Sequence, residues 1–435
     1  MNKEAIKEQL MSILKDGEKT AEAVKLGIEI EHLVVQQKDF QSVTYYEESG
    51  IETILKKLLK KDYAGKYEGE YLVGLTKDGM DITLEPGGQL EFSTRPCIHL
   101  AHIQQVYEKF LEDLLPIIEE QNQYLLGVGY HPQTLIKDIP FNPKKRYQYM
   151  SSYLQKTGKY ALNMMKGTAS VQVAIDYTSE LDFIKKFRVA SFLTPLFYLI
   201  TDNAPIFEGE VYDKFSVRSL IWENTDPGRS GIIKGSLDKK FNYQNYAEYL
   251  LHSKPICVLE NGELIPVGDQ SLWEVYKEKD SLSKEEVEHL YTMVFPDVRG
   301  KYYIEIRMAD SMPLDLSMAY LAMIKGLFYN RQNLEELYSA SLGYKDEEIR
   351  SLKDAVIEQG YQAHFRGQEL GSFCDRVIRM AEHALEDEER VMLKPLKELI
   401  LTRETYGQQI KGSYKKQGFE GLKGLIITKK SQRRD

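Results

Sequence analysis

The chain has 435 residues, of which 42% are hydrophobic and 28% are charged, so it can bury a large core, and its length corresponds to two or three domain equivalents. Its net charge of −9 is spread along the sequence, which argues against nucleic acid as an obligatory partner but allows a small polyanion at a local basic cluster. Cys97, Cys257 and Cys374 are far apart, which argues against a zinc cage or a disulfide framework and favours a reducing cytoplasm.

The first predicted elements are a helix and a strand. Residues 2–15 carry apolar side chains at helical spacing and lack the apolar core of a signal peptide. The apolar stretches of the chain are shorter than the roughly 20 residues that span a bilayer, so we expect a soluble protein without a membrane partner. Residues 27–35 alternate apolar and polar side chains, which predicts a strand with Glu29 and Glu31 on one face.

A second acidic stretch follows a predicted helix over residues 49–60. Residues 81–95 contain two short alternating runs on either side of Pro86-Gly87-Gly88, which predicts two strands joined by a tight turn. Their polar positions include Glu85 and Glu91. We therefore expect two further carboxylates beside a turn whose glycines allow close approach of the backbone.

The middle of the chain alternates helices with strands. We expect helices over 99–121, from 144 onwards and over 179–203, and strands over 124–130 and 170–176. The last of these strands places Gln172 among its outward-facing residues. Residues 216–231 are polar and are expected to be irregular.

The remaining predictions concern a hairpin, one more strand and a helical end. The Asn261-Gly262 pair predicts a hairpin over 255–267, and Ser283 with Glu286 predicts a capping box for a helix to residue 294. Residues 299–308 read as a strand with Glu305 and Arg307 on its polar face. From residue 313 onwards we expect four or five helices and a frayed basic tail over 429–434, with no linker that separates independent domains.

These strands share one pattern, with an apolar face that can pack on helices and a polar face that carries acids. An antiparallel sheet can have helices on one face and an open cavity on the other. Many carboxylates in one cavity need raised pKa values or bound cations, and ligands that are all oxygen favour magnesium or manganese over zinc. The predicted metal ligands are Glu29, Glu31, Glu85, Glu91, Gln172 and Glu305.

Arginines supply the opposite charge. Guanidinium groups bind phosphates and carboxylates through paired hydrogen bonds, and hard cations beside them most often serve phosphate substrates. The sequence contains no Gly-x-x-x-x-Gly-Lys-Ser/Thr and no Gly-x-Gly-x-x-Gly motif, so a nucleotide would be bound by metal ions and arginines. The candidate arginines are Arg95, Arg146, Arg218, Arg229, Arg299 and Arg307.

Each feature also has a simpler structural interpretation. Two glutamates on one strand are usually a solvated sheet face, and Glu85 with Glu91 can form an exposed turn. Glu305 and Arg307 can form an ion pair within the sheet. Repetition of the same pattern on separate strands favours the functional interpretation.

Several motifs resemble, in the same order, the plant and proteobacterial type of glutamate–cysteine ligase. They include Gly27-Ile-Glu-Ile-Glu31, Leu84-Glu-Pro-Gly-Gly-Gln-Leu-Glu91, Arg218-Ser-Leu-Ile-Trp222 and Glu305-Ile-Arg307, and the resemblance covers roughly residues 22–330. It implies a glutamine-synthetase-like α+β fold, in which a curled antiparallel sheet forms a funnel backed by helices. It also implies a catalytic ATP-dependent ligase domain over 1–330 and a helical region over 331–435 that packs on the same domain.

The activity that this resemblance implies is the ATP-dependent joining of the γ-carboxylate of glutamate to the amine of cysteine through γ-glutamyl phosphate, the first step of glutathione biosynthesis. The implied cofactors are ATP and Mg²⁺, with Mn²⁺ possible as the metal, and the enzyme would be a monomer or a homodimer. The resemblance assigns the six metal ligands above to ions that bridge the ATP phosphates and glutamate. It makes Arg307 and Arg146 catalytic, Arg218, Trp222, Thr168 and Ser170 substrate-binding, and Arg229 and Arg299 nucleotide-binding.

Two alternatives stay open from the sequence. The motifs do not select the amine, and Ala169 departs from the cysteine of plant members, so a γ-glutamyl ligase that uses another amine is one alternative. The other is a non-catalytic sensor of nucleotide and metal on the same scaffold.

Overall fold

The computed structural model describes residues 1–429 and is organised around a nine-stranded antiparallel sheet. Its strands run in the order β14-β15-β7-β1-β5-β4-β3-β2, and β6 also pairs with β1. The strand bounds are β1 (Leu26–Gln36), β2 (Ala64–Glu68), β3 (Tyr71–Lys77), β4 (Met80–Leu84), β5 (Leu90–Thr94), β6 (Gln123–Leu126), β7 (Ser170–Ile175), β14 (Val298–Gly300) and β15 (Ile304–Asp310).

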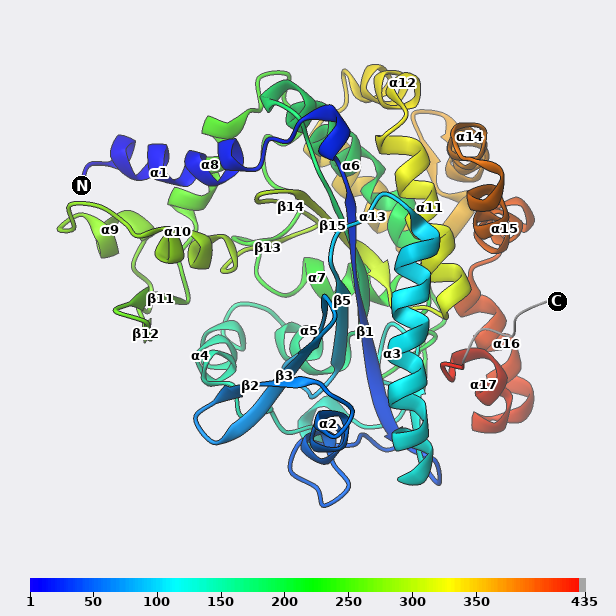
Figure 1. The fold of residues 1–435 in the computed structure, drawn as a ribbon. Coiled ribbons are helices and arrows are strands. Elements are labelled where there is room, and N and C mark those ends of the chain that lie inside the picture. Colours follow the sequence, from blue (N-terminus) through cyan, green and yellow to red (C-terminus); the bar gives the residue numbers. More distant parts are fainter. Residues whose placement is uncertain (430–435) are drawn as a thin grey trace.

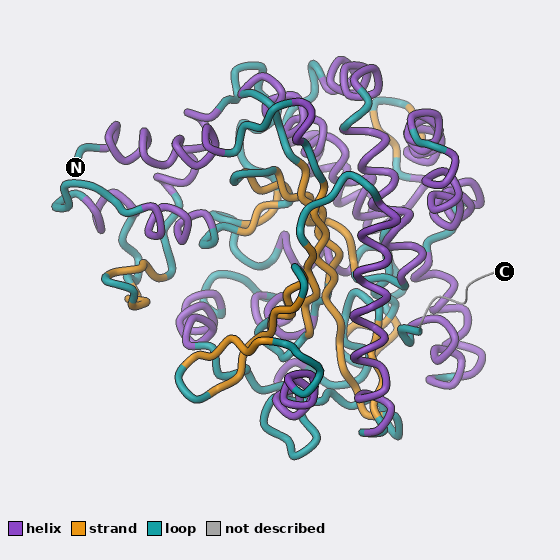
Figure 2. The backbone as a smooth tube through the Cα atoms, viewed as in Figure 1, coloured by secondary structure: helices purple, strands orange, loops and turns teal. Residues whose placement is uncertain are grey.

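Long helices cover one face of this sheet. The helices α3 (Leu100–Glu120), α6 (Glu180–Ile200) and α11 (Leu314–Phe328) contact β5, β15 and β7 respectively. The apolar positions of the strands, such as Ile30 and Phe92, are buried against them in the main core. Figure 2 shows the strands as one band through the middle of the molecule, with α3 and α11 beside β1 in Figure 1.

The opposite face of the sheet is covered by shorter helices. These are α4 (Lys145–Leu154), α5 (Ala161–Gly167) and α7 (Val217–Glu223), and α7 also contacts β15. Their apolar side chains form a second, smaller core that includes Met150, Met164, Trp222 and Phe295. The polar face of the sheet is therefore enclosed at its centre.

The end of the chain packs on the same body. The helices are α12 (Arg331–Ser341), α13 (Asp346–Gln359), α14 (Leu370–Ala384), α15 (Asp387–Thr402), α16 (Tyr406–Gln417) and α17 (Phe419–Ile426). Of these, α12 and α13 contact α6, while α14 and α15 contact α11. The main core is continuous from strand β1 to α15, so the helices beyond residue 330 share the core of the sheet.

Smaller elements complete the described part of the chain. The helix α1 (Lys3–Asp16) packs on α8 (Tyr243–His252) and α10 (Lys284–Tyr291). The rest are α2 (Ile51–Leu59), α9 (Leu272–Tyr276), the two-stranded sheets β8 (Ile206–Phe207) with β9 (Glu210–Val211), β10 (Ser230–Gly231) with β13 (Phe295–Pro296), β11 (Cys257–Glu260) with β12 (Glu263–Pro266) and β16 (His364–Phe365) with β17 (Gln368–Glu369), and short 3-10 helices at Ala21–Ala23, Ile136–Asp138 and Gly360–Gln362.

Most predicted elements are confirmed, including the hairpin at Asn261-Gly262 and the capping box of Ser283 with Glu286. Three predictions are wrong. The segment 216–231 contains the helix α7, which is too short and too fully buried to show a helical spacing of apolar residues. The predicted single strand 299–308 is instead the hairpin β14–β15. The described chain after residue 313 forms seven helices, α11 to α17, because residues such as Gly418, at φ 58°, end them early.

Two further expectations concern the basic tail and membrane-spanning helices. The basic tail predicted over 429–434 lies outside the described residues from residue 430 onwards. Within the described chain, no helix has the combination of length and apolar character that crossing a bilayer requires.

Candidate active site

The register of the sheet brings the predicted acids onto one face. Glu31 of β1 lies opposite Glu91 of β5, and Glu29 of β1 lies opposite Gln172 of β7. Directly opposed residues of an antiparallel pair point to the same side, so these four side chains share the face that is turned away from α3 and α11. Glu85 lies at the turn after β4, where its N–H donates to the carbonyl of Gln89 at 3.0 Å.

A cavity of about 260 Å³ lies over this face. Its acidic side is formed by Glu29, Glu31, Glu85 and Glu91, and Gln172 lies beside them. Its basic side is formed by Arg146, Arg218, Arg299, Lys301 and Arg307. The remaining lining residues are mainly apolar or aromatic, among them Tyr147, Met150, Met164, Met165, Trp222 and Phe295.

The clustered acids resist ionisation. Burial and the neighbouring Glu85 raise the pKa of Glu31 to about 7, and burial with Glu305 raises the pKa of Glu29. Burial and the charges of Glu29, Glu85 and Glu31 also raise the pKa of Glu91 well above its usual range. Both causes oppose negative charge, so a cation bound between these groups would favour their ionised forms.

Ser170 lies behind the acidic wall and holds Glu31 in place. Its N–H donates to Glu31 Oε2 at 2.8 Å, and its hydroxyl donates to Oε1 at 2.8 Å. Gln172 Nε2 donates to the same Oε1 at 3.1 Å. Ser170 is only 1% exposed and does not line the cavity, so its role as a substrate contact stays a prediction, whereas Thr168 does line the cavity.

Glu305 belongs to the basic wall. Its Oε2 pairs with Arg299 Nε at 2.5 Å and Arg307 Nη1 at 3.4 Å, and its Oε1 pairs with Lys301 at 2.8 Å. Burial opposes its ionisation, but these three cations outweigh burial and hold the pKa of Glu305 well below its usual range. Both oxygens of Glu305 are occupied by cations and the side chain does not line the cavity, so its contacts organise the basic side chains, and its role as a metal ligand stays a prediction.

Arg218 and Trp222 line the cavity, and each carries a buried donor without a partner among the described residues. Arg218 donates to the carbonyl of Arg307 from Nε at 3.2 Å and from Nη2 at 3.0 Å. The Trp222 ring lies 5.4 Å from the guanidinium carbon of Arg218 and 5.8 Å from that of Arg307. Among the described residues, neither Arg218 Nη1 nor Trp222 Nε1 has a hydrogen-bond partner. Buried donors without partners indicate a place for a bound acceptor.

Two of the predicted arginines lie outside the cavity. Arg229 is buried, pairs with Asp226 Oδ2 at 2.6 Å and donates to the carbonyl of Met293 at 3.0 Å, so its contacts here are within the protein and its contact with nucleotide stays a prediction. Arg95 is exposed and does not line the cavity. Arg146 and Arg299 do line it, and their roles stay predictions.

Sequence reasoning missed several residues of the cavity. Lys301 is the clearest, since it pairs with Glu305 four positions later and faces Glu29. The available signal was that Lys301 lies two positions after Arg299 in a predicted strand. Tyr147 donates to the carbonyl of Leu84 at 2.9 Å; the available signal was the Arg146-Tyr147 pair, which also resembles the family but was given no role for Tyr147.

The donor set fits a hard cation in chemistry but is not assembled around one point. Among residues 1–429, no three side chains of His, Cys, Asp or Glu lie close enough to hold a metal ion together. The carboxylates of Glu29, Glu31, Glu85 and Glu91 nevertheless line one cavity and repel one another. Oxygen donors of this kind match magnesium or manganese, and a shift of side chains toward the ion would complete its coordination.

Comparison with known proteins agrees with this arrangement. The structure resembles that of a glutamate–cysteine ligase from Francisella tularensis solved in complex with AMP, with a TM-score of 0.59 and 15% identity over 92% of this chain and 86% of that chain. The predicted curled antiparallel sheet backed by helices is confirmed by this likeness in fold. The protein is an enzyme of the ligase class with a glutamine-synthetase-like fold.

The family follows from the sequence comparisons. The model of glutamate–cysteine ligase family 2 matches residues 25–409, and the chain belongs to this family. It is 31% identical to the chloroplastic glutamate–cysteine ligase B of Oryza sativa subsp. japonica, over 89% of this chain and 79% of the relative. It is 30% identical to the chloroplastic enzyme of Nicotiana tabacum, over 87% of this chain and 74% of the relative.

These relatives correct one expectation. Both plant ligases are chloroplastic by name, which contradicts the predicted cytoplasmic location. The prediction depended on separated cysteines, which indicate a reducing environment but do not distinguish one reducing compartment from another.

Proposed function

We propose that this protein joins the γ-carboxylate of L-glutamate to the amine of L-cysteine, with ATP and a divalent cation, and that the reaction passes through γ-glutamyl phosphate. Membership of glutamate–cysteine ligase family 2 supports the choice of substrates. The observation that carries the proposal is a single cavity in which four carboxylates face five cationic side chains. Such a site suits a reaction between a carboxylate and a polyphosphate, both of which are anions that repel each other in water.

The first step is phosphoryl transfer. A γ-carboxylate oxygen of glutamate attacks the γ-phosphorus of ATP, the bond from that phosphorus to the bridging oxygen breaks, and ADP leaves. We assign Arg307 and Arg146 to the oxygens of the transferring phosphoryl group, because both line the cavity and the planar guanidinium group matches the geometry of phosphate oxygens. Arg299 and Lys301 lie on the same wall and suit the phosphates that remain on ADP.

The second step is acyl transfer. The neutral amine of cysteine attacks the carbonyl carbon of the acyl phosphate, phosphate leaves, and the amine loses a proton. We assign Arg218 Nη1 and Trp222 Nε1 to the α-carboxylate of glutamate, because both are buried donors without a partner among the described residues. Thr168 lies on the same cavity and completes this subsite in the proposal. Positioning of the two reactants then supplies most of the rate enhancement.

Glu29, Glu31, Glu85 and Glu91, with the amide oxygen of Gln172, are the residues that would hold the divalent cations. Bound Mg²⁺ would neutralise the phosphates and polarise them for attack. Gln172 Oε1 currently accepts a hydrogen bond from Arg307, so it would exchange this partner on binding a metal ion. Glu31 is already oriented by Ser170, which makes it the most firmly placed of the four carboxylates.

Phosphate release by the purified protein tests the proposal. With ATP, Mg²⁺, glutamate and cysteine we expect stoichiometric release of phosphate and formation of γ-glutamylcysteine, measured by mass spectrometry. No release, or release that does not depend on glutamate, would contradict the proposal. A panel of other amines in the same assay tests the acceptor, because a γ-glutamyl ligase for a different amine would use cysteine poorly.

A further inference from the structure

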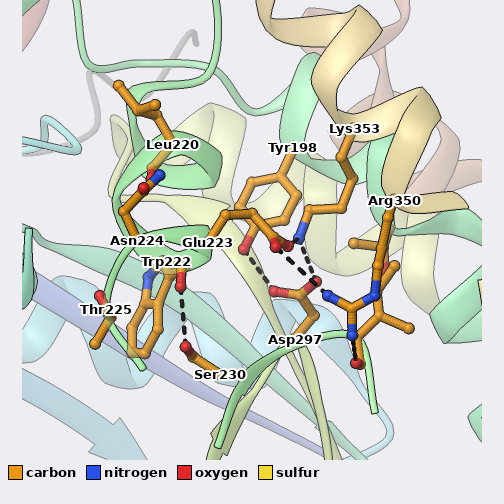
Figure 3. Close-up of polar contacts among 12 residues, drawn as sticks. Tyr198, Leu220, Trp222, Glu223, Asn224, Thr225, Ser230, Asp297, Arg350 and Lys353 are labelled. Atoms are coloured by element: carbon orange, nitrogen blue, oxygen red, sulfur yellow. Dashed lines mark hydrogen bonds and ion pairs between the residues drawn. The ribbon is translucent and has the colours of Figure 1, made fainter. Parts of the chain in front are cut away.

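A buried lysine beyond residue 330 contacts the back of the active site. Lys353 lies on α13, and its side chain is 1% exposed. Its ammonium group pairs with the carboxylate of Glu223, at the end of α7, and with Asp297 Oδ2 at 2.7 Å. Figure 3 shows these three side chains converging, with Tyr198 on the other side of Asp297. The hydroxyl of Tyr198 donates to Asp297 Oδ1 at 2.7 Å.

Both partners of Lys353 belong to segments that carry active-site residues. Glu223 follows Trp222 directly and lies one and a half turns after Arg218 on the same helix. Asp297 lies between β13 and β14, two residues before Arg299, and its carbonyl accepts a hydrogen bond from the N–H of Arg307 at 3.1 Å. Lys353 therefore joins the helix of the proposed glutamate subsite to the strands of the proposed phosphate subsite.

The two segments also meet inside the cavity, which closes a ring of contacts. Arg218 donates twice to the carbonyl of Arg307, at 3.2 and 3.0 Å. One side of the ring is this contact, and the other side is the pair of bonds from Lys353 to Glu223 and Asp297. Arg218 and Arg307 are thus connected directly by this contact and indirectly through Lys353 and its two carboxylates.

The other end of α7 is anchored by the C-terminal part of the chain as well. Ser216 caps this end in the left-handed conformation, at φ 53°, and its N–H donates to Asp202 Oδ1 at 3.1 Å. The second oxygen of Asp202 accepts from the hydroxyl of Thr405, the residue before α16, at 3.0 Å. Residues beyond 330 therefore hold α7 at both of its ends.

We propose that Lys353 is a positioning residue for glutamate: it holds α7 against the β13–β14 segment and so sets the place of Arg218 and Trp222 relative to Arg307. The inference rests on the proposed function, and it gives the helical C-terminal region a task in the active site. Burial opposes the charge of Lys353, but Asp297 and Glu223 keep its pKa above the usual value, so the ammonium group is charged at neutral pH.

A second buried pair provides a matched control. Lys186 pairs with Asp182 at 3.0 Å, with side chains that are 4% and 19% exposed, against 1% and 23% for Lys353 and Glu223. Neither Lys186 nor Asp182 lines the cavity. Lys353 pairs with two carboxylates and Lys186 with one, so both K353M and K186M should lower stability, K353M by more, while only K353M removes a contact to α7 and the β13–β14 segment.

The test compares these variants in glutamate saturation and in the fluorescence of Trp222. The chain has two tryptophans, and Trp273 lies on α9, so in a W273F background the emission comes from Trp222 alone. We expect K353M to raise the KM for glutamate at least about tenfold, with a much smaller change in the KM for ATP, and to shift the emission of Trp222. K186M should lower the melting temperature without either change.

The outcomes separate this inference from the proposed function. If K353M melts earlier but keeps the glutamate KM and the Trp222 emission of the parent, Lys353 is only structural and the inference is wrong. If K353M does not fold, E223Q with D182N as its control decides in the same way, because each replaces a carboxylate with an amide of the same shape. If the unmodified protein releases no phosphate, the proposed function fails, while the Trp222 emission still reports whether Lys353 positions α7.

Discussion

Glu31 of β1 and Glu91 of β5 face each other across neighbouring strands, on the face of the sheet that lines the cavity. Opposed like charges destabilise a sheet, by up to about 1 kcal/mol for a pair. Here burial adds to the repulsion and raises the pKa of both carboxyl groups. The folded protein thus retains an unfavourable arrangement that a bound cation would relieve.

Glu91→Gln tests this relationship. The variant removes one charge of the pair and keeps the shape, so we expect a slightly higher free energy of unfolding without metal and a loss of turnover of at least about 100-fold. Unfolding in urea, with and without MgCl₂, measures the first effect, and phosphate release measures the second. The gain in stability from magnesium should be smaller in E91Q than in the parent; an equal gain would place the ion elsewhere.

Arg218→Ala removes the free Nη1 donor of the proposed glutamate subsite. Bonds to charged groups contribute about 1.5–3 kcal/mol, so we expect the KM for glutamate to rise about 10- to 100-fold. Arg95→Ala is the matched control, because Arg95 is exposed and outside the cavity. Unchanged glutamate saturation in R218A would refute the assignment.

Ser170→Ala distinguishes the observed role of Ser170 from its predicted one. The hydroxyl bond to Glu31 is lost, while the cavity lining stays the same. Partners that orient metal ligands typically affect metal affinity 10- to 100-fold, so the Mg²⁺ concentration at half-maximal rate should rise about tenfold, with little change in the glutamate KM. Titration of activity against each component measures both values, and a rise in the glutamate KM alone would restore the predicted substrate contact.

Glu305→Gln should behave differently from Glu29→Gln. Glu305 holds Arg299, Lys301 and Arg307, so its loss disorders the cations, and we expect turnover to fall about 100-fold at any magnesium concentration. E29Q should recover part of its activity when magnesium is raised, because Glu29 lines the cavity as a proposed ligand. Recovery of E305Q by magnesium would make Glu305 a metal ligand after all.

The buried ring of His131 should make the free energy of unfolding fall at acidic pH. Burial lowers its pKa to about 3, and Nδ1 accepts from the N–H of Thr134 at 3.1 Å, so the ring is neutral when folded. In the unfolded chain the His131 ring binds a proton near pH 6.5. The contribution of His131 to the free energy of unfolding is therefore fully present above that pH and is lost as the pH falls toward 3.

His131→Asn keeps an acceptor for the same N–H and removes the titration. We expect the stability of the parent to fall by roughly 2 kcal/mol more than that of H131N between about pH 6.5 and 4.5. Urea unfolding at a series of pH values measures the difference. His102→Asn, at an exposed position, is the control, and equal slopes for parent and H131N would show that His131 is not the responsible group.

Strand periodicity predicted which acids share a face but not how they are held. The alternation around Glu29, Glu31 and Glu91 was enough to place them together, because period two fixes the face of a side chain. Apart from the pair of Glu305 with Arg307, the partners of Ser170 and Glu305 could not be predicted in this way. They depend on register and on rotamers, which are set by packing against the rest of the molecule.

The short helix α7 also could not be predicted from the local sequence pattern. Its seven residues include Arg218 and Trp222, and nearly all are buried, so polar and apolar positions do not alternate with a helical period. Lys353 contacts its last residue, Glu223, and Thr405 contacts Asp202, which accepts from Ser216 at its other end; both lie far along the chain. Contacts between residues so far apart in the chain cannot be predicted from a local pattern. The resemblance in motifs did assign Arg218 and Trp222 to the substrate, and both line the cavity.

The two edge strands of the sheet that carries the cavity differ in exposure. The strand β14 is buried, whereas all five residues of β2 are exposed at the other edge. An exposed edge offers unpaired N–H and C=O groups to strands of other molecules and is a risk for aggregation. Here the edge is short, carries Lys66 and Glu68, and has an irregular register after Lys66. The protein can therefore keep an open sheet around its cavity and still resist edge-to-edge association.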